Sequence, residues 1–306
     1  MGRMAITTLS CFDFRLRSEI DLPELLAAAQ DDPRPVVDIR LGHVPESLPG
    51  AAAPAWGVER AGPAALLTVS SVARYLIEDG ESIVVDPFPG ASERRVRLFL
   101  LGSALGILCF QRGLLPLHAN AIVADGAGYA FAGPSGAGKS TLAGHFSRAG
   151  YEVLCDDVCA VTLGPDRRPL IWPGLPRVKL WHDAAEVLGH ETAGLDRVAE
   201  EVDKYHVGLP PPRREGPVPL RRLYLLERAE GDSPGAVAPL RGQQAMQALM
   251  AQTYRREYLA PLGLVAQHFH LCAAVAAEIE VCRLERAWGY QVFDRELARL
   301  RAHIEA

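Results

Sequence analysis

The sequence contains little cysteine, few aromatic residues and almost no lysine. Its six cysteines form no CxxC pair in 306 residues, and no charged segment followed by an apolar run opens the chain. Neither a metal-binding cysteine pair nor export to an oxidising compartment is therefore predicted. We expect a reduced, globular protein of the cytoplasm.

Long hydrophobic runs and an excess of positive charge are also missing. The longest near-continuous apolar run is Leu98–Phe110, whereas a membrane-spanning helix needs about 20 apolar residues. We expect a buried helix there. The net charge is −5, and the arginine pairs at 213–214 and 221–222 are short and separated by prolines. We therefore expect no nucleic-acid partner and no membrane.

Lysine is the rarest charged residue in the chain. Only three of the 32 basic residues are lysines, namely Lys139, Lys179 and Lys204. A GC-rich genome that favours arginine codons would explain the shortage. Even so, a chain that uses arginine almost everywhere would keep lysine where the chemistry requires a compact ammonium group. The three positions are therefore candidates for a functional site.

The length corresponds to two domains or one large one. The pattern changes near Arg112–Leu117, so we expect an α+β N-terminal region over residues 1–112 and a second domain over residues 113–306. For the N-terminal region the patterns predict a helix over 21–30, a loop over 44–63, strands at 65–69, 73–78 and 82–86, and a long helix over 92–112.

The second domain alternates between strand and helix patterns. Two strands at 118–124 and 129–132 lead through a glycine-rich loop into a helix that ends at Gly150, and an apolar strand follows at 151–155. Beyond it the patterns predict strands at 159–162, 176–181, 222–226 and 279–284, and helices at 243–254, 264–277 and 293–304.

The strongest motif lies between the second of these strands and the helix. It reads Gly133, Pro134, Ser135, Gly136, Ala137, Gly138, Lys139, Ser140, Thr141, and matches G-x-x-x-x-G-K-[ST] at every fixed position. The glycines let backbone N–H groups face a phosphate, and the helix adds its positive N-terminal end. Lys139 would reach the β- and γ-phosphates and the Ser140 hydroxyl would bind Mg²⁺. The motif predicts ATP and Mg²⁺ as cofactors.

An acidic pair, Asp156 and Asp157, directly follows the apolar strand. One carboxylate there would hold Mg²⁺, and the other would accept a proton from an attacking hydroxyl. Adjacent side chains on a strand point to opposite faces, so the two share a site only if the chain bends. The alternative is that one of them caps the next turn and faces water.

Four basic residues are further candidates. His118 begins the strand that precedes the loop, so it would lie beside the phosphates, or else it is a hydrogen-bonded core histidine. Arg177 and Lys179 alternate in a strand-like run, and their shared face would either bind an anion or meet solvent. Lys204 lies in the polar segment 200–206, which is either a mobile surface loop or a lid that closes over ATP.

The run from His118 to Asp157 resembles the catalytic core of the HPr kinase/phosphorylase family. That family has a histidine on a β-hairpin, a GxSGxGKS loop, and an Asp-Asp pair soon after the loop helix. The resemblance implies an α/β fold: a P-loop kinase core of the HPr kinase type, with a mixed sheet around the loop helix. It also implies ATP-dependent phosphorylation of a serine hydroxyl. Asp156 would be the base, aided by His118, while Asp157 and Ser140 would serve the metal and Lys139 the phosphates.

The chain also departs from that family. It has no counterpart of the family's glycine-bearing signature strand, and the corresponding region, 172–181, reads WPGLPRVKLW. This departure argues against a reverse phosphorylase activity and against HPr as the substrate. The chain looks more like the HPr-kinase-like tailoring kinases of lasso-peptide clusters, some of which phosphorylate a serine at the end of a precursor peptide. In that interpretation Arg177, Lys179 and Lys204 would contact phosphates or the terminal carboxylate of the substrate.

The leading hypothesis is therefore a kinase of a precursor peptide. A kinase of an HPr-type carrier protein, a small-molecule kinase and a non-catalytic ATP-binding regulator are the alternatives. The expected partner is a peptide or protein with an acceptor serine, and a homo-oligomer is compatible with the sequence.

Overall fold

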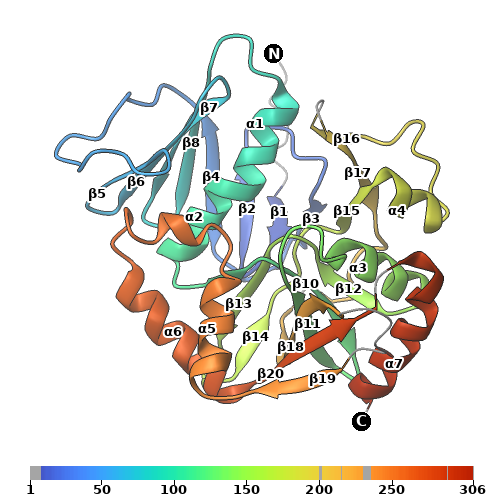
Figure 1. Ribbon diagram of the computed structural model, residues 1–306. Helices are drawn as coiled ribbons and strands as arrows, with labels where there is room; N and C mark the ends of the chain where they lie inside the picture. Colours follow the sequence, from blue (N-terminus) through green and yellow to red (C-terminus); the bar gives the residue numbers. More distant parts are fainter. Residues whose placement is uncertain (1–7, 200–201, 215, 230–235, 288, 306) are drawn as a thin grey trace. The chain divides into compact units, whose positions relative to one another are not determined.

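Figure 1 shows the computed structural model of the chain, which describes residues 8–199, 202–214, 216–229, 236–287 and 289–305. The fold is mixed α/β and contains mixed sheets. The described residues form two compact units. Unit 1 comprises those up to Pro116 together with Arg255–Phe269, and unit 2 comprises the rest. The expected domains, 1–112 and 113–306, stay a prediction.

Unit 1 is built on an eight-stranded sheet with the strand order β3-β1-β2-β4-β8-β7-β6-β5. The sheet is mixed because β4 runs parallel to both of its neighbours, whereas the remaining pairs are antiparallel. Its strands are β1 (Thr8–Cys11), β2 (Phe14–Ser18), β3 (Leu26–Ala27), β4 (Val36–Leu41), β5 (Val58–Ala61), β6 (Ala64–Val69), β7 (Ala73–Glu78) and β8 (Ser82–Pro87).

The three strands predicted between residues 65 and 86 are confirmed as β6, β7 and β8. Strand β7 alternates buried and less buried residues, as expected for a strand with one packed face. The loop predicted over 44–63 is wrong at its end, where β5 pairs with β6 and fully buries Val58.

The helix predicted over 21–30 is wrong. Leu26 and Ala27 form strand β3 and pair with β1, and the Ala28 N–H donates to the Thr8 carbonyl at 2.8 Å. So short a helix is marginal in water without packing. In the sheet, the backbone groups of this segment form hydrogen bonds with β1 instead. Local helix propensity does not reveal such pairing.

The long helix predicted over 92–112 forms with one interruption. It consists of α1 (Glu93–Phe99), the π-helical turn η1 (Leu100–Ala104) and α2 (Leu105–Gln111). Ser92 caps it by accepting a hydrogen bond from the Arg95 N–H, and Gly113 follows with φ 74°. The apolar run within it is largely buried, as expected. Across the described ranges, no helix is both long enough and apolar enough to cross a membrane.

Unit 2 contains two sheets. In the larger one the strands that lie in unit 2 have the order β12-β10-β11-β18-β14-β13, with β20 beside β18 and β19 beside β20. Strand β18 runs parallel to β11 and β20, whereas β10 is antiparallel to β11 and β12. The smaller sheet, β15-β17-β16, is antiparallel.

The strands and helices predicted after α2 form in the expected order, but β14, α4, β16, β17 and β19 were not predicted. The strands are β9 (Leu115–Leu117), β10 (Ala119–Ala124), β11 (Ala127–Ala132), β12 (Glu152–Cys155), β13 (Cys159–Leu163), β14 (Pro169–Ile171), β15 (Arg177–Trp181), β16 (Arg197–Ala199), β17 (Val202–Gly208), β18 (Val218–Arg228), β19 (Val237–Leu240) and β20 (Glu280–Arg286). The helices are α3 (Lys139–Arg148), α4 (His182–Val187), α5 (Gln243–Ala251), η2 (Arg256–Tyr258), α6 (Val265–Glu278), η3 (Tyr290–Val292) and α7 (Phe293–Glu305).

Helix α3 is the element that positions the site. Leu142, Ala143 and Phe146 form its buried face at helical spacing. Phe146 stacks on Phe131 of β11, with ring centroids 5.5 Å apart, and Phe131 stacks on Tyr224 of β18 at 5.2 Å. The helix contacts β10, β12 and β15 (Figure 1). This packing holds its N-terminus just beyond the end of β11.

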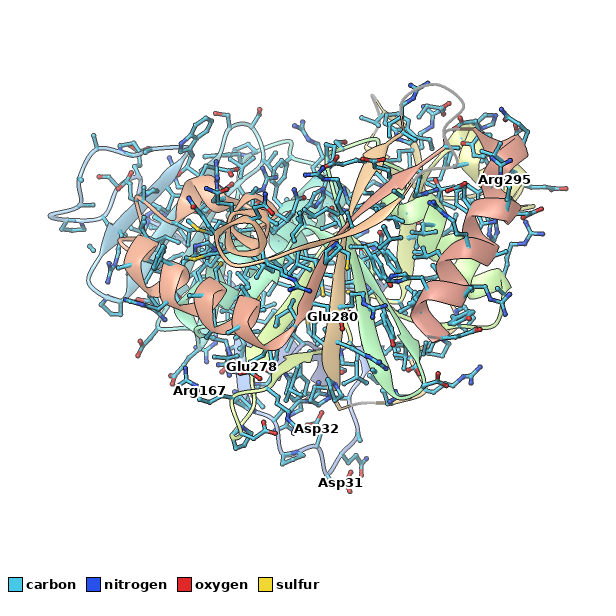
Figure 2. The ribbon with its side chains drawn as sticks, turned by 60° about the horizontal axis from the view of Figure 1, so that its bottom comes forward. Asp31, Asp32, Arg167, Glu278, Glu280 and Arg295 are labelled. Carbon is cyan, nitrogen blue, oxygen red and sulfur yellow. The ribbon has the colours of Figure 1, made fainter. Side chains whose placement is uncertain are left out.

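Helix α7 packs against α3 and closes the same core. Phe293, Leu297 and Leu300 are buried in it, whereas Arg295 lies on the exposed face of the helix (Figure 2). The Phe293 ring stacks on His145 of α3, with centroids 3.9 Å apart.

Candidate functional site

The phosphate-loop motif occupies the turn between β11 and α3. Three of its glycines, Gly133, Gly136 and Gly138, have positive φ angles of 153°, 84° and 80°, a region that side chains rarely adopt. Gly138 is the N-cap of α3 and provides no side-chain cap, which leaves the N–H groups of the first turn available to an anion. The loop therefore has the backbone needed to surround an anion.

Lys139 begins α3 and is buried. Its ammonium group donates to the Gly133 carbonyl at 2.7 Å and to the Pro134 carbonyl at 3.2 Å. Burial lowers the pKa of Lys139, against the opposing charges of Asp156 and Asp157. The ammonium is thus held inside the loop, next to where the motif predicts phosphates.

The Asp156 carboxylate lies directly against the loop helix. The Ser140 hydroxyl is 3.0 Å from each of its two oxygens, and the Lys179 N–H donates to Oδ2 at 2.9 Å. Burial raises the pKa of Asp156, and the neighbouring charge of Asp157 raises it further. Only 8% of Asp156 is exposed, so its charge depends on the few groups around it.

Asp157 faces a different set of partners. The Lys179 ammonium lies 2.5 Å from its Oδ2, and the His118 Nδ1 lies 3.2 Å from both its Oδ1 and its backbone carbonyl. Burial would raise the pKa of Asp157. The charge of Lys179 and the hydrogen bonds from His118 and Lys179 outweigh burial and hold this pKa well below its usual range.

A bend in the backbone brings the two acids into one site. Asp157 has φ 75°, which ends the alternation of a strand, and both Asp156 and Asp157 line the same pocket. The expected pairing is corrected, however. The family resemblance implied that His118 aids Asp156 and that Asp157 and Ser140 serve the metal, whereas the structure places Asp156 against Ser140 and Asp157 against His118. The direction of the bend at Asp157 decides which aspartate meets which partner. Two adjacent aspartates in a sequence do not predict that direction.

The pocket has a volume of about 730 Å³ and lies entirely within unit 2. All three lysines of the chain line it. Other residues that line it are His118, Ser135, Gly136, Gly138, Ser140, Thr141, Asp156, Asp157, Trp181, Asp183, Asp203, Arg286, Tyr290 and Phe293. Of the motif residues, Gly133, Pro134 and Ala137 are not among the described residues that line the pocket: the first two supply carbonyls to Lys139, and Ala137 packs against the core.

Lys204 and Arg177 differ from what their sequence neighbourhoods predicted. Lys204 lies in strand β17, not in an irregular loop, and its ammonium is 5.6 Å from the centre of the Trp181 ring. Glu200 and Glu201, in the same predicted loop, lie outside the described residues. Arg177 and Lys179 share one face of β15, but of the two only Lys179 is among the described residues that line the pocket.

Arg286, Trp181 and Tyr290 line the pocket but were not singled out from the sequence. Arg286 ends a strand far from the motif and is one arginine among many, so no local signal marks it. Trp181 is the last residue of the WPGLPRVKLW run. That run contributed to the family resemblance, but no role was assigned to its tryptophan. Tyr290 and Trp181 are both exposed despite their large aromatic rings.

The oxygen donors at the site fit an Mg²⁺ ion that has few protein ligands. Ser140 and Asp156 supply a hydroxyl and a carboxylate, which are hard donors. Among the described residues, no group of three or more His, Cys, Asp or Glu side chains could hold a metal ion. Mg²⁺ is commonly bound by one or two protein ligands together with phosphates and waters. The donors thus fit a metal that arrives with a nucleotide.

Comparisons with known proteins give little further information. No family model and no curated protein matches the chain. The solved structure of the Hpr(Ser) kinase/phosphatase from Coxiella burnetii is similar at 11% sequence identity and a TM-score of 0.30, over 62% of this chain and 92% of that one. A likeness of that strength carries no argument about this chain.

Proposed function

We propose that the chain is an ATP- and Mg²⁺-dependent kinase that transfers a phosphoryl group to a serine hydroxyl of a peptide or protein. One observation carries the proposal: the Ser140 hydroxyl of the phosphate-loop motif lies 3.0 Å from both carboxylate oxygens of Asp156. This contact joins the loop to the acid that a phosphoryl-transfer enzyme needs beside it.

The residues of the loop would hold the triphosphate. The N–H groups of the loop and of the first turn of α3 would bind phosphate oxygens, and the Lys139 ammonium would contact them from within the loop. Ser140 and Asp156 would hold Mg²⁺. Bound Mg²⁺ would orient the phosphates and neutralise their charge.

His118 is the residue that we propose as general base. Both acceptors at 3.2 Å from its Nδ1 belong to Asp157, a carboxylate oxygen and a carbonyl oxygen. The hydrogen of the neutral ring is therefore on Nδ1, and Nε2 keeps the lone pair that can accept a proton. Asp157 would fix this tautomer, which is the task of the aspartate in a Ser-His-Asp triad. Lys179 would keep Asp157 ionised.

A serine on a peptide is the acceptor suggested by the family resemblance. In particular, the WPGLPRVKLW run and the long N-terminal half suggest a precursor peptide of the lasso type. The exposed Trp181 and Tyr290 at the pocket are compatible with a peptide as the acceptor. A regulator that only binds nucleotide would have no use for the Asp157–His118 pair, so this pair favours an enzyme.

Mass spectrometry of peptides incubated with the full chain, ATP and Mg²⁺ tests the proposal. We expect a mass increase of one phosphate on a peptide that carries the acceptor serine, and none when that serine is replaced by alanine. Candidate substrates should include precursor peptides and an HPr-type carrier protein, since the acceptor identifies which of the two hypotheses holds.

Lys139→Ala provides the enzyme control. We expect it to abolish phosphate transfer and to weaken nucleotide binding, because a neutral methyl group replaces the cation within the loop. Wild-type turnover in this variant would refute the proposed use of the loop. ATP binding by the wild type without transfer to any substrate or water would favour the regulator.

A further inference from the structure

Arg286 ends strand β20 and lies beside the phosphate loop. It lines the same pocket as Lys139. Its Nη1 is 3.7 Å from the point that a Cβ atom on Gly138 would occupy. Because Gly138 is the N-cap of α3, the guanidinium group stands next to the end of the helix that attracts anions.

The guanidinium group is buried, and its charge is poorly compensated. Only 7% of Arg286 is exposed, and within the described ranges Nη1 has no hydrogen-bond partner. The acid that stabilises its charge most, Glu296, accepts a hydrogen bond from Arg299 at 2.9 Å, and the Arg299 charge itself opposes that of Arg286. Burial lowers the pKa of Arg286 to about 10, so the group remains charged at neutral pH.

Packing holds the guanidinium group in this position. Its central carbon lies 5.0 Å from the centre of the Phe293 ring, an arrangement that favours a cation, and Phe293 is itself fixed by stacking on His145. Leaving a buried charge without a full set of partners is costly. Among the described residues, Nη1 of Arg286 is therefore a donor without a partner, held by packing beside the loop.

The other described cations of the pocket have partners within the protein. Lys179 pairs with Asp157, the Lys139 ammonium donates to two loop carbonyls, and Lys204 lies over Trp181. Arg286 therefore contributes positive charge that no acid among the described residues pairs with in a salt bridge.

We infer that Arg286 is a phosphate-binding residue of this site, which donates hydrogen bonds to a phosphate oxygen of the bound nucleotide. The inference rests on the proposed function and adds a residue from outside the loop motif. Arginine suits this task because its planar group offers several donors to phosphate oxygens.

Calorimetric titrations of the full chain with ATP and with adenosine, both in Mg²⁺ buffer, test the inference. Arg286→Met keeps much of the side-chain volume and removes the donors. We expect its ATP affinity to fall by about 10- to 100-fold, the usual effect of losing a hydrogen bond to a charged group. Adenosine affinity should stay within about twofold of wild type. Arg286→Lys keeps the charge and should recover part of the loss.

Arg283→Met is the matched control, because Arg283 lies on the same strand and pairs with Glu227 outside the pocket lining. It should leave ATP affinity unchanged. Thermal unfolding without nucleotide separates binding from structure: Arg286→Met should melt at or above the wild-type temperature, because it removes a buried, poorly paired charge.

The outcomes distinguish this inference from the proposed function. Wild-type ATP affinity in Arg286→Met would overturn the inference and leave the kinase proposal standing. A lowered melting temperature with equal losses for ATP and adenosine would also overturn it, because a structural role explains both. If the wild-type chain binds no ATP, the proposed function itself fails.

Discussion

Asp156 and Asp157 are neighbours in sequence, but their surroundings separate their chemistry. Asp156 meets a hydroxyl and a backbone N–H, and burial raises its pKa. Asp157 meets an ammonium and an imidazole, and its pKa is lowered. A carboxylate in the first setting suits a metal, whereas one in the second suits the orientation of a histidine.

The two asparagine substitutions should therefore have different effects. We expect Asp156→Asn to weaken Mg²⁺-dependent ATP binding, because an amide is a poor ligand for Mg²⁺. We expect Asp157→Asn to retain ATP·Mg²⁺ binding and to lower kcat by about 10²- to 10⁴-fold, since the histidine loses the partner that fixes its tautomer.

Calorimetry with and without Mg²⁺, combined with steady-state kinetics, checks both variants, and each variant serves as the control for the other. The opposite result, with metal-dependent binding lost only in Asp157→Asn, would restore the roles that the family resemblance implied.

At the scale of elements, local patterns predicted most of unit 2. Strands β10, β11 and β12 and helix α3 were predicted to within a few residues, because each has apolar residues at its own period and glycines at its ends. The prediction was wrong for 21–30, for Val58–Ala61 and for the loop that contains Lys204, which lies in β17. There, pairing with a neighbouring strand decides the conformation, and short segments carry little signal of that pairing.

The close contact between the loop and β18 leads to a prediction for Gly133. A Cβ atom there would lie 2.9 Å from the Leu226 carbonyl oxygen, at a φ of 153°. We expect Gly133→Ala to destabilise the chain by about 1–3 kcal/mol and to weaken ATP binding, because backbone atoms, unlike a flexible side chain, must move to make room.

Gly150→Ala is the control for Gly133→Ala. Gly150 also has a positive φ, of 88°, but an added Cβ would meet nothing within 4 Å. In urea unfolding, the loss of unfolding free energy in Gly150→Ala should report the cost of φ strain alone. This variant should bind ATP like the wild type. If both variants bind ATP like the wild type, ATP binding does not depend on the backbone conformation of the loop at Gly133.

For the molecule as a whole, the distribution of lysine is informative. Residues 139, 179 and 204 come from a helix, a strand of the smaller sheet and its neighbouring strand, and all three line one pocket. The arginine-rich remainder of the chain contains no other lysine. This convergence supports the view that lysine is kept where a compact ammonium is needed.

Lysine acetylation with an amine-selective reagent should therefore report on the pocket. We expect ATP·Mg²⁺ to reduce acetylation at Lys139, Lys179 and Lys204, as measured by peptide mass spectrometry, and to protect activity. The Lys139→Ala variant serves as the control: because it should bind nucleotide weakly, ATP·Mg²⁺ should protect its Lys179 and Lys204 less than in the wild type. Unchanged labelling at all three lysines would contradict a nucleotide site in this pocket.

The sequence by itself determined the loop motif, the helix that follows it, the apolar strand that ends in two acids, and the three lysines worth following. These features are local, because each depends on residue types at fixed short spacings.

Only the tertiary structure decided which acid meets Ser140 and which meets His118, because the bend at Asp157 sets the direction of each side chain. It also decided that Lys179 and Lys204 share a pocket with the loop, through the pairing of β15 with β17. Arg286 reaches the loop because β20 pairs with β18, which itself pairs with β11, and long-range pairing of this kind leaves no mark on the local sequence.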